Sequence, residues 1–406
     1  MGLFDDISYS EIIKNYEGFQ NPHVVVKVSG KDITDKNDLA ISQVNIELSS
    51  GFEASVASFR IYKIFDISKG SYLTDQYEKK LYIGLPIEIW LGYGIKIKPV
   101  FVGVITGIGF RYEDPDEPYI VVKAMDAKGV MMANRNSRQL TATQIDKAVK
   151  EVLEGAAYNS LTSQGVIKEI MVETTPDSPI PAGIGAAPPA PPTAPTTEKP
   201  TIEMVNESDY EFIVRMAKRV NFEFFIHVGN VIFRPAKIDI GTMMTIEPGN
   251  ILRSFDIEYD ITGQVGEVEV RATDTDKGEL ITSKTGVQNT WSYGSKAGKL
   301  VKGNKYVYLD PSVHTQAEAN MRRDYLVENI SYKFGTIYCE TVGVPELAPG
   351  RFVKINALGN GPDNKFYIQK LRHVMSKKGE YKCVLEGKAN NIKYVPITLP
   401  GLGSLM

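Results

Sequence analysis

The chain has 406 residues, of which 43% are hydrophobic and 23% charged, and its formal net charge is −3. This length allows two or three domains with their own cores, and the lack of a basic excess argues against specific nucleic-acid binding. The only cysteines, Cys339 and Cys383, exclude a disulfide framework, and we interpret them as buried apolar residues. Abundant glycine, tyrosine and phenylalanine favour a β-rich protein with many turns.

Residues 1–23 are predicted to form an N-terminal arm with one helical turn at Ser10–Ile13. The first ten residues lack the basic and apolar regions of a secretory signal, and Asp6 stands where a myristoylation motif needs Ser or Thr. No apolar run approaches eighteen residues, so we expect no membrane span. We therefore expect a protein made in the cytoplasm without a signal peptide.

Residues 24–135 are predicted to form a first tube-like antiparallel β-barrel. Short apolar runs begin at Val24, Ile41 and Ala57, and turn signals separate them with no long helix between. This spacing is typical of a sandwich or barrel.

Residues 136–250 are predicted to form a connecting α+β region. Its first helix covers Thr143–Glu154, with Thr143 as the N-cap and Gly155 as the stop. Between residues 176 and 200 the composition changes to a proline-rich sequence, which predicts a solvated loop.

A helix followed by a hairpin is predicted over Asn206–Pro235, within the same region. Ser208–Glu211 forms a capping box, and an apolar stripe follows it at helical spacing. Phe222–Val228 alternates, Gly229-Asn230 turns the chain, and Val231–Phe233 returns. A helix packed on a hairpin needs no catalytic chemistry, so this pattern alone assigns no activity.

Residues 251–390 are predicted to form a second tube-like β-barrel, related to the first by internal duplication. Three landmarks recur at nearly constant offsets: Gly84 and Gly350 are 266 residues apart, Phe101 and Phe366 are 265 apart, and Tyr119 and Tyr381 are 262 apart. Two unrelated all-β units could also match this well. Before this second set of strands we expect a polar loop or long hairpin at Lys277–Lys305 and a helix at Thr315–Val327.

Residues 391–406 are predicted to form a C-terminal tail that docks on a partner. The tail carries more apolar residues than a purely solvated end would. The candidate contact residues are Tyr394, Val395, Ile397, Leu399, Leu402 and Leu405.

No catalytic, cofactor-binding or metal-binding constellation is evident. His23, His227, His314 and His373 have no partner at metal-ligand spacing, and we interpret His227 and His373 as structural residues in strands. The acidic pairs Asp5/Asp6 and Asp114/Asp116 lie in turn-like, solvated sequence, so we do not interpret either as the acid/base pair of a glycosidase. We therefore expect no enzyme activity, no cofactor and no metal.

Several motifs follow one another in a fixed order along the chain. They are Ser208–Ile213, Ala217–Arg219 and Phe222–Phe225, with Gly84–Ile87, Phe101–Ile105, Gln316–Leu326, Leu347–Ile355 and Tyr367–His373. Together these motifs resemble the phage late control protein D family, which is related to the N-terminal hub part of VgrG spike proteins of type VI secretion. The resemblance covers about Val24 to Lys388, while the proline-rich insertion departs from the family core.

The resemblance implies a homotrimeric baseplate hub of a contractile phage tail, a tailocin or a phage-tail-like injection particle. Two barrels per chain would give a ring of six, which adapts a hexameric tail tube to a trimeric spike. The implied partners are the spike protein, the tail tube protein, other baseplate subunits and a tape measure protein. We expect the tail to contact the spike and the arm to contact baseplate or tube subunits.

Two other functional classes remain open from the sequence. A β-rich adhesion or carbohydrate-binding tail module would bind a specific glycan as an isolated monomer. A peptidoglycan hydrolase would act on purified cell-wall material, but the chain shows no acid/base pair for this reaction.

Overall fold

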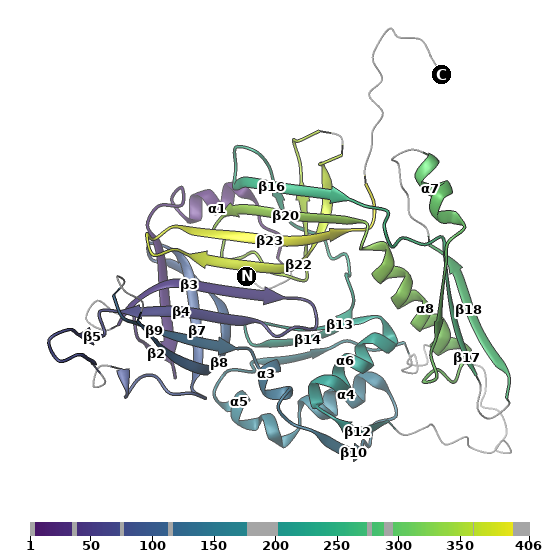
Figure 1. Cartoon of the computed structure of the whole chain (residues 1–406), viewed down its shortest axis with the longest axis horizontal. Coiled ribbons are helices and arrows are strands. Elements are labelled where there is room, and N and C mark those ends of the chain that lie inside the picture. Colours follow the sequence, from purple (N-terminus) through teal and green to yellow (C-terminus); the bar gives the residue numbers. More distant parts are fainter. Residues whose placement is uncertain are drawn as a thin grey trace, which may run out of the picture.

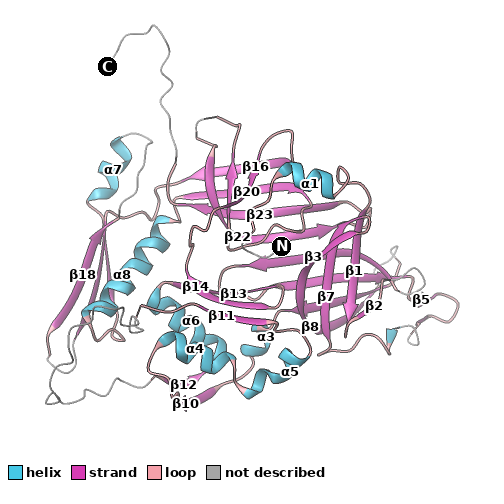
Figure 2. Cartoon of the chain, turned by 180° about the vertical axis from the view of Figure 1, so that it is seen from behind, coloured by secondary structure: helices cyan, strands magenta, loops and turns pink. Residues whose placement is uncertain are grey.

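The structure is a computed structural model that describes residues 5–34, 39–73, 77–112, 117–176, 202–273, 278–287, 295–359 and 361–392. Strands dominate it: the helices between residues 128 and 220 lie along one side of the large sheet, those between residues 295 and 331 lie at one end, and the helix at residues 9–15 lies apart from them near the strands at residues 252–259 and 335–342 (Figures 1 and 2). The predicted fold class, mainly β with minor α and antiparallel sheets, is confirmed. Almost all of the predicted proline-rich loop and of the C-terminal tail lies outside the described residues.

One sheet of 13 strands organises the described part of the chain. Ten antiparallel pairings join eleven of these strands in one path, while β15 (Thr242–Ile246) and β21 (Phe352–Ile355) extend the sheet beside β22. The path runs through β16 (Leu252–Tyr259), β20 (Gly335–Val342), β23 (Tyr381–Ala389), β22 (Asn364–Met375), β3 (Ala40–Ser49), β4 (Val56–Tyr62), β9 (Tyr119–Met125), β8 (Lys96–Arg111), β7 (Pro86–Tyr93), β1 (Pro22–Val28) and β2 (Lys31–Asp32).

Alternation of side chains explains why these segments form half-buried strands. In β23 every second residue is buried, and β20 follows the same period. The inward residues of both predicted units enter one hydrophobic core, which includes Ile46, Phe59, Ile337 and Leu371. Burying each such side chain contributes about 1.5–3 kcal/mol, so this shared core holds the two units together.

The two halves of the path repeat the same strand order. The first half reads β3-β4-β9-β8 and the second reads β16-β20-β23-β22. Both contain a register shift at matching places, between Ile105 and Gly107 where β8 pairs β9, and between Ile368 and Lys370 where β22 pairs β23. Conserved bulges of this kind redirect a strand in the same way in each copy, so they support the predicted duplication.

The paired residues correct two predicted landmarks. Gly387 of β23 occupies the place of Ala124 in β9, which is a shift of 263 residues, and this shift aligns Tyr119 with Lys382 rather than with Tyr381. The same shift relates β8 to β22, so Phe101 corresponds to Asn364 rather than to Phe366. Both predicted offsets are wrong, by one and two residues, because the landmarks followed residue type whereas the ladder follows backbone hydrogen bonds.

The helical region packs α4 (Ile145–Leu153) and α6 (Asp209–Val220) against small sheets. The predicted capping box at Ser208 is present, and α6 ends at Asn221, whose φ of 57° suits the left-handed region that asparagine tolerates. The other elements are α3 (Lys128–Met131), the 3-10 helix η1 (Ala156–Tyr158), α5 (Asn159–Ser163), β10 (Asn136–Gln139), β11 (Glu169–Val172), β12 (Glu203–Glu207), β13 (Phe222–His227) and β14 (Asn230–Pro235).

A smaller sheet with two helices lies beside the large sheet, at the right of Figure 1. Its helix α8 packs against the sheet and against α6. Its elements are β17 (Glu267–Thr273), β18 (Leu280–Gly286), α7 (Ser295–Lys302), β19 (Lys305–Leu309) and α8 (Gln316–Ser331). The remaining described elements of the chain are α1 (Tyr9–Asn15), β5 (Phe65–Asp66) and β6 (Ser71–Tyr72).

Two local predictions are wrong. The N-cap of α4 is Gln144 and makes no side-chain cap bond, so Thr143 does not cap this helix. The segment Lys277–Lys305 is not simply a loop or hairpin, because it contains β18 and α7. Its strand pairs with β17, and this tertiary pairing outweighs the polar, glycine-rich composition that predicted a loop.

Candidate functional site

The residues singled out by the sequence do not come together in one site. All six candidate contact residues of the tail, Tyr394 to Leu405, lie outside the described residues, as do Asp114 and Asp116. Asp6 is mostly exposed and forms an ion pair of 2.6 Å with buried Arg351. The groups of His, Cys, Asp and Glu within the described ranges include none that could hold a metal ion.

The N-terminal arm is fixed to its own chain from Asp5 onward. Its helix α1 has the capping box of Ser8 and Glu11, and the buried Tyr16 hydroxyl donates to Glu346 at 2.6 Å. The Tyr16 ring also lies 5.3 Å from that of Tyr93 in β7. The arm therefore joins β7 of the first unit to the loop before β21 of the second.

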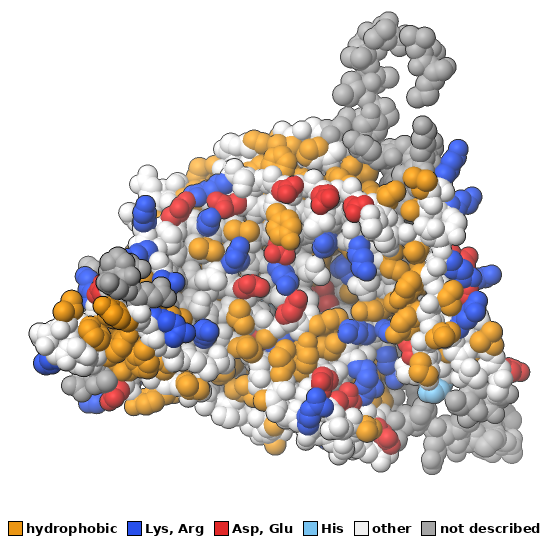
Figure 3. All heavy atoms as spheres, viewed as in Figure 1, with side chains coloured by type: hydrophobic (Ala, Val, Ile, Leu, Met, Phe, Trp, Pro, Cys, Tyr) orange, Lys and Arg blue, Asp and Glu red, His pale blue; other side chains and the backbone are white. Residues whose placement is uncertain are grey.

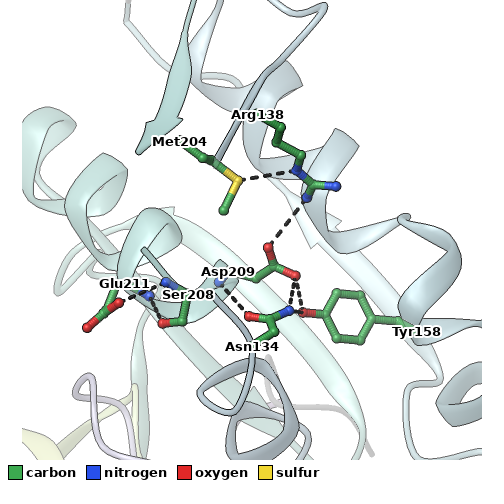
Figure 4. Close-up of polar contacts among 7 residues, drawn as sticks. All are labelled: Asn134, Arg138, Tyr158, Met204, Ser208, Asp209 and Glu211. Carbon is green, nitrogen blue, oxygen red and sulfur yellow. Dashed lines mark hydrogen bonds and ion pairs between the residues drawn. The ribbon is translucent and has the colours of Figure 1, made fainter. Parts of the chain in front are cut away.

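Figure 4 shows the most elaborate polar cluster of the helical region, centred on buried Asp209 at the start of α6. Its carboxylate accepts hydrogen bonds from Tyr158 at 2.5 Å and from Asn134 at 2.7 Å, and Arg138 lies 3.4 Å away. Burial raises the pKa of the Tyr158 hydroxyl, which therefore stays protonated and donates. Because every partner is engaged, this cluster anchors the helix N-terminus rather than offering a free acid or base.

A second buried cluster connects the hairpin β13–β14 to the second unit. Arg234 Nε lies 2.8 Å from Glu223, and its Nη2 donates to the Gly350 carbonyl at 2.5 Å. The Tyr367 hydroxyl in β22 donates to the same carboxylate. Burial raises the pKa of Glu223, while the adjacent guanidinium acts in the opposite direction. This arrangement ties three elements together without contact to solvent.

The predicted structural roles of the cysteines and of His373 agree with their surroundings. His373 is fully buried, with Nδ1 at 2.8 Å from the Tyr381 hydroxyl and at 3.2 Å from Cys383 Sγ. Burial lowers the pKa of His373 to about 3 and raises the pKa of each thiol, Cys339 and Cys383, to about 12. A neutral imidazole and protonated thiols are inert, so this cluster resembles an active site in composition only.

Lys128 is the one fully buried lysine of the described chain. Its ammonium donates to the carbonyls of Gly51 at 3.0 Å and Glu53 at 2.8 Å, next to Asp126. Burial lowers the pKa of Lys128 to about 8, because desolvation outweighs the attraction of the nearby carboxylate. Both acceptors belong to the turn between β3 and β4, so Lys128 fixes this turn to α3.

Two strands of the large sheet have backbone edges without a partner strand among the described residues. Within the described residues, β16 pairs with β20 alone, and residues 107–111 of β8 pair with β9 alone. Apolar groups are exposed at both places: Phe255 is 41% exposed, Phe110 is 46% exposed and Tyr112 is 66% exposed. Unpaired strand edges with apolar side chains are ready to pair with another chain.

The face seen in Figure 3 carries basic and acidic side chains interspersed with one another, together with several apolar areas. No large area of one charge sign is visible on this face. A mixed face of this kind does not have the basic stripe that a nucleic-acid-binding surface needs.

Comparison with known proteins identifies the fold. A tail protein from Neisseria meningitidis MC58 aligns over 91% of this chain and 97% of its own, at 12% identity and a TM-score of 0.61. The 43 kDa tail protein of prophage MuSo2 from Shewanella oneidensis aligns over 91% of this chain and 99% of its own, at 13% identity and a TM-score of 0.62. The chain therefore has the fold of phage tail proteins along nearly its whole length.

A further structure, of a PdpA–VgrG complex, aligns over 91% of this chain and 65% of its own, at 8% identity and a TM-score of 0.50. The Alg8 N-terminal domain model matches residues 192–377, which is less than half of the chain. No curated protein matches the sequence. Helices long and apolar enough to cross a membrane are absent from the part of the chain that the structure describes.

Proposed function

We propose that this chain is a structural baseplate hub protein of a contractile phage tail or a phage-tail-like injection particle. Three copies would form a ring that connects a hexameric tail tube to a trimeric spike. The observation that carries this proposal is the sheet of two like units, with an open edge at β16 in one unit and an open strand segment in β8 of the other. The fold shared with phage tail proteins supports it.

The duplication supplies the symmetry that such an adaptor needs. Each chain contributes two similar units, so a ring of three chains presents six similar units to the tube. The same ring has only three identical chains to offer to the spike. Pairing of open strand edges between subunits would bury backbone groups that are otherwise exposed, and it makes large obligate interfaces.

Nothing in the described residues favours catalysis over assembly. The buried acids and the buried histidine are saturated by neighbours or lie away from solvent, as the clusters of Asp209, Glu223 and His373 show. An adhesion module remains the second candidate because the fold alone does not fix the place of a tail protein in its particle.

The first test is the mass of the purified full chain in solution by light scattering, with negative-stain images of the same peak. A ring of about three times the 45.0 kDa chain mass with a central hole is the expected result. A monomer that persists at high concentration would contradict the hub, and specific glycan binding by that monomer would establish the adhesion module instead.

A further inference from the structure

Within one chain, one pairing of strands joins the two units, and we call it the complete joint. Two further strands correspond to the two strands of this joint, but among the described residues they are not paired with each other. In the complete joint, β22 of the second unit pairs antiparallel with β3 of the first. The repeated strand order makes β8 the counterpart of β22, and β16 the counterpart of β3. In the described part of the chain, these two counterparts have no strand on the corresponding sides.

The pairings across the sheet define the correspondence residue by residue. In each unit, residues that lie directly opposite one another on neighbouring strands form a line across the sheet. Each strand of one unit contributes one residue to its line, as does the corresponding strand of the other unit. In the first unit the row is Asn45, Ser58, Lys123 and Gly107, and in the second unit it is Asp256, Tyr338, Glu386 and Lys370. Residues of β8 therefore correspond to residues of β22 that are 263 higher, and residues of β3 to residues of β16 that are 211 higher.

From this correspondence, the residue pairing of the complete joint predicts which residues of β16 and of β8 would lie opposite each other. We call these two strand edges the open ends. In the complete joint Val374 lies opposite Asn45. Their counterparts are Arg111 in β8 and Asp256 in β16. We propose that β16 of one copy pairs antiparallel with residues 107–112 of a second copy, with Asp256 opposite Arg111. The inference rests on the proposed ring and specifies which strands close it.

The chemistry of the opposed side chains fits this register. On one face of the strands, Arg111 lies opposite Asp256, which carries the opposite charge. On the other face, three opposed pairs are apolar, and their six residues are partly or largely exposed in the single chain. Opposite-charge pairs and apolar pairs directly across two antiparallel strands stabilise their pairing. The apolar pairs are Ile108 with Tyr259, Phe110 with Ile257, and Tyr112 with Phe255.

One hydrogen bond shows which residue pairs of the complete joint are hydrogen-bonded pairs and which are non-hydrogen-bonded pairs. The Ser50 N–H donates to the Gln369 carbonyl at 3.0 Å. In an antiparallel ladder the hydrogen-bonded pairs recur at every second residue, so His373 and Ile46 form such a pair. Val374 and Asn45 form a non-hydrogen-bonded pair.

The proposed register needs hydrogen bonds between the backbone groups of Ile257 and Phe110. The Asp260 N–H donates to the Phe334 carbonyl at 2.9 Å, which directs the backbone of Ile257 away from β20. On β8, the Phe110 carbonyl accepts a bond of 3.0 Å from the side chain of Arg111. Ile257 and Phe110 are the counterparts of the hydrogen-bonded pair in the complete joint. In the proposed ladder the Ile257 N–H would replace the Arg111 side chain as the donor to the Phe110 carbonyl.

The contacts already made beside β8 are compatible with this ladder. The Tyr72 hydroxyl donates to the Arg111 carbonyl at 3.0 Å, and the Tyr72 ring lies 5.0 Å from that of Phe110. In the proposed phase Arg111 is in a non-hydrogen-bonded pair, so its carbonyl keeps the bond from Tyr72. The apolar pairs would extend this aromatic cluster across the joint.

Disulfide trapping in the full chain tests the register. Non-hydrogen-bonded pairs bring Cα atoms to about 4.5 Å, within the range of a disulfide. The test variant is the double substitution Arg111→Cys with Asp256→Cys, oxidised mildly and run on a non-reducing gel. The internal positive control is Asn45→Cys with Val374→Cys, and the control of shifted register is Arg111→Cys with Glu258→Cys.

We expect the test variant to form covalent multimers up to three chains, and the internal control to form a disulfide within one chain. The shifted pair would have its Cα atoms roughly 7–8 Å apart and should link at least tenfold more slowly. The native thiols of Cys339 and Cys383 are buried and should not contribute.

The outcomes separate this inference from the proposed function. A three-chain mass by light scattering without any link through Arg111→Cys with Asp256→Cys would overturn the register and leave the ring. Faster linking of the shifted pair would also overturn it. A monomeric mass would overturn both. If the cysteine variants fail to fold, Arg111→Glu and Asp256→Arg serve instead: each alone should weaken trimers, and their combination should restore them, whereas additive weakening contradicts the pairing.

Discussion

The joint between the two units and the open ends of the sheet are built from corresponding strands, but they differ in what surrounds them. Ile46 in the joint is fully buried, whereas its counterpart Ile257 in β16 is only partly buried. His373 in the joint is fully buried, whereas its counterpart Phe110 is 46% exposed. The same backbone arrangement is therefore buried in one place and partly exposed in the other, where we propose that a second copy binds.

In the proposed ring, the strand pairing that joins the two units within a chain would be repeated between chains. The internal joint forms on folding, since its strands are tethered, whereas the proposed joint between chains would depend on protein concentration. Substitutions in the first should change the stability of the chain, and substitutions in the second should change its assembly.

The largest effect should come from the buried ion pair beside the joint. Arg234→Ala leaves the Glu223 carboxylate buried without its guanidinium partner, and breaking such a pair costs about 3–5 kcal/mol. We expect the denaturant midpoint of the full chain to fall accordingly. The matched control is Arg135→Ala, whose ion pair with Glu211 is exposed and whose loss should barely move the midpoint. Equal effects of the two substitutions would contradict the buried role of Arg234.

A matched pair of isoleucines compares the joint with the open edge directly. Ile46→Ala should lower the free energy of unfolding by about 2–5 kcal/mol, because it leaves a cavity in the core. Ile257→Ala should cost less than half as much in a monomeric sample, while it weakens the trimer. Denaturation and light scattering at several concentrations measure both effects. A larger loss of monomer stability for Ile257→Ala would show that the edge is part of the core.

The joint should also be sensitive to acid. Burial lowers the pKa of His373 to about 3, well below the value of about 6.5 expected in the unfolded chain. Between these values the unfolded chain binds a proton that the folded chain does not, so stability falls as the pH falls. From pH 7 to pH 5 this loss is about 2 kcal/mol for His373 alone.

His373→Gln should reduce this pH slope without removing it, because burial also lowers the pKa of His227 to about 4. Unfolding curves between pH 4.5 and 7.5 measure the slope. A full slope in His373→Gln would mean that the residue is charged, or solvated, in the folded chain.

The smallest effect on the ring itself should come from the C-terminal tail. Deletion of residues 394–406 should leave the trimer mass unchanged but abolish co-purification with the spike protein, if the tail is the spike contact that we propose. Loss of trimers on this deletion would assign the tail to the ring rather than to the spike.

Local patterns in the sequence predicted those features that depend on nearby residues. Ser208 and Glu211 form their capping box because both partners lie in one helical turn. The strands around β23 follow the alternation of apolar residues, and the glycine at residue 229 permits the turn of the β13–β14 hairpin with its φ of 86°. The duplication was also visible, because two copies of one fold keep the same order of strands and turns.

Only the tertiary structure decided how the two units meet and which edges stay open. Alternation fixes the two faces of a strand but does not select its partner, so the pairing of β22 with β3 could not be predicted from either strand alone. The buried pair of Glu223 and Arg234 likewise depends on Tyr367 and Gly350, more than one hundred residues away in the chain. Such contacts form because packing brings distant strands together, and that information is not contained in any single local window.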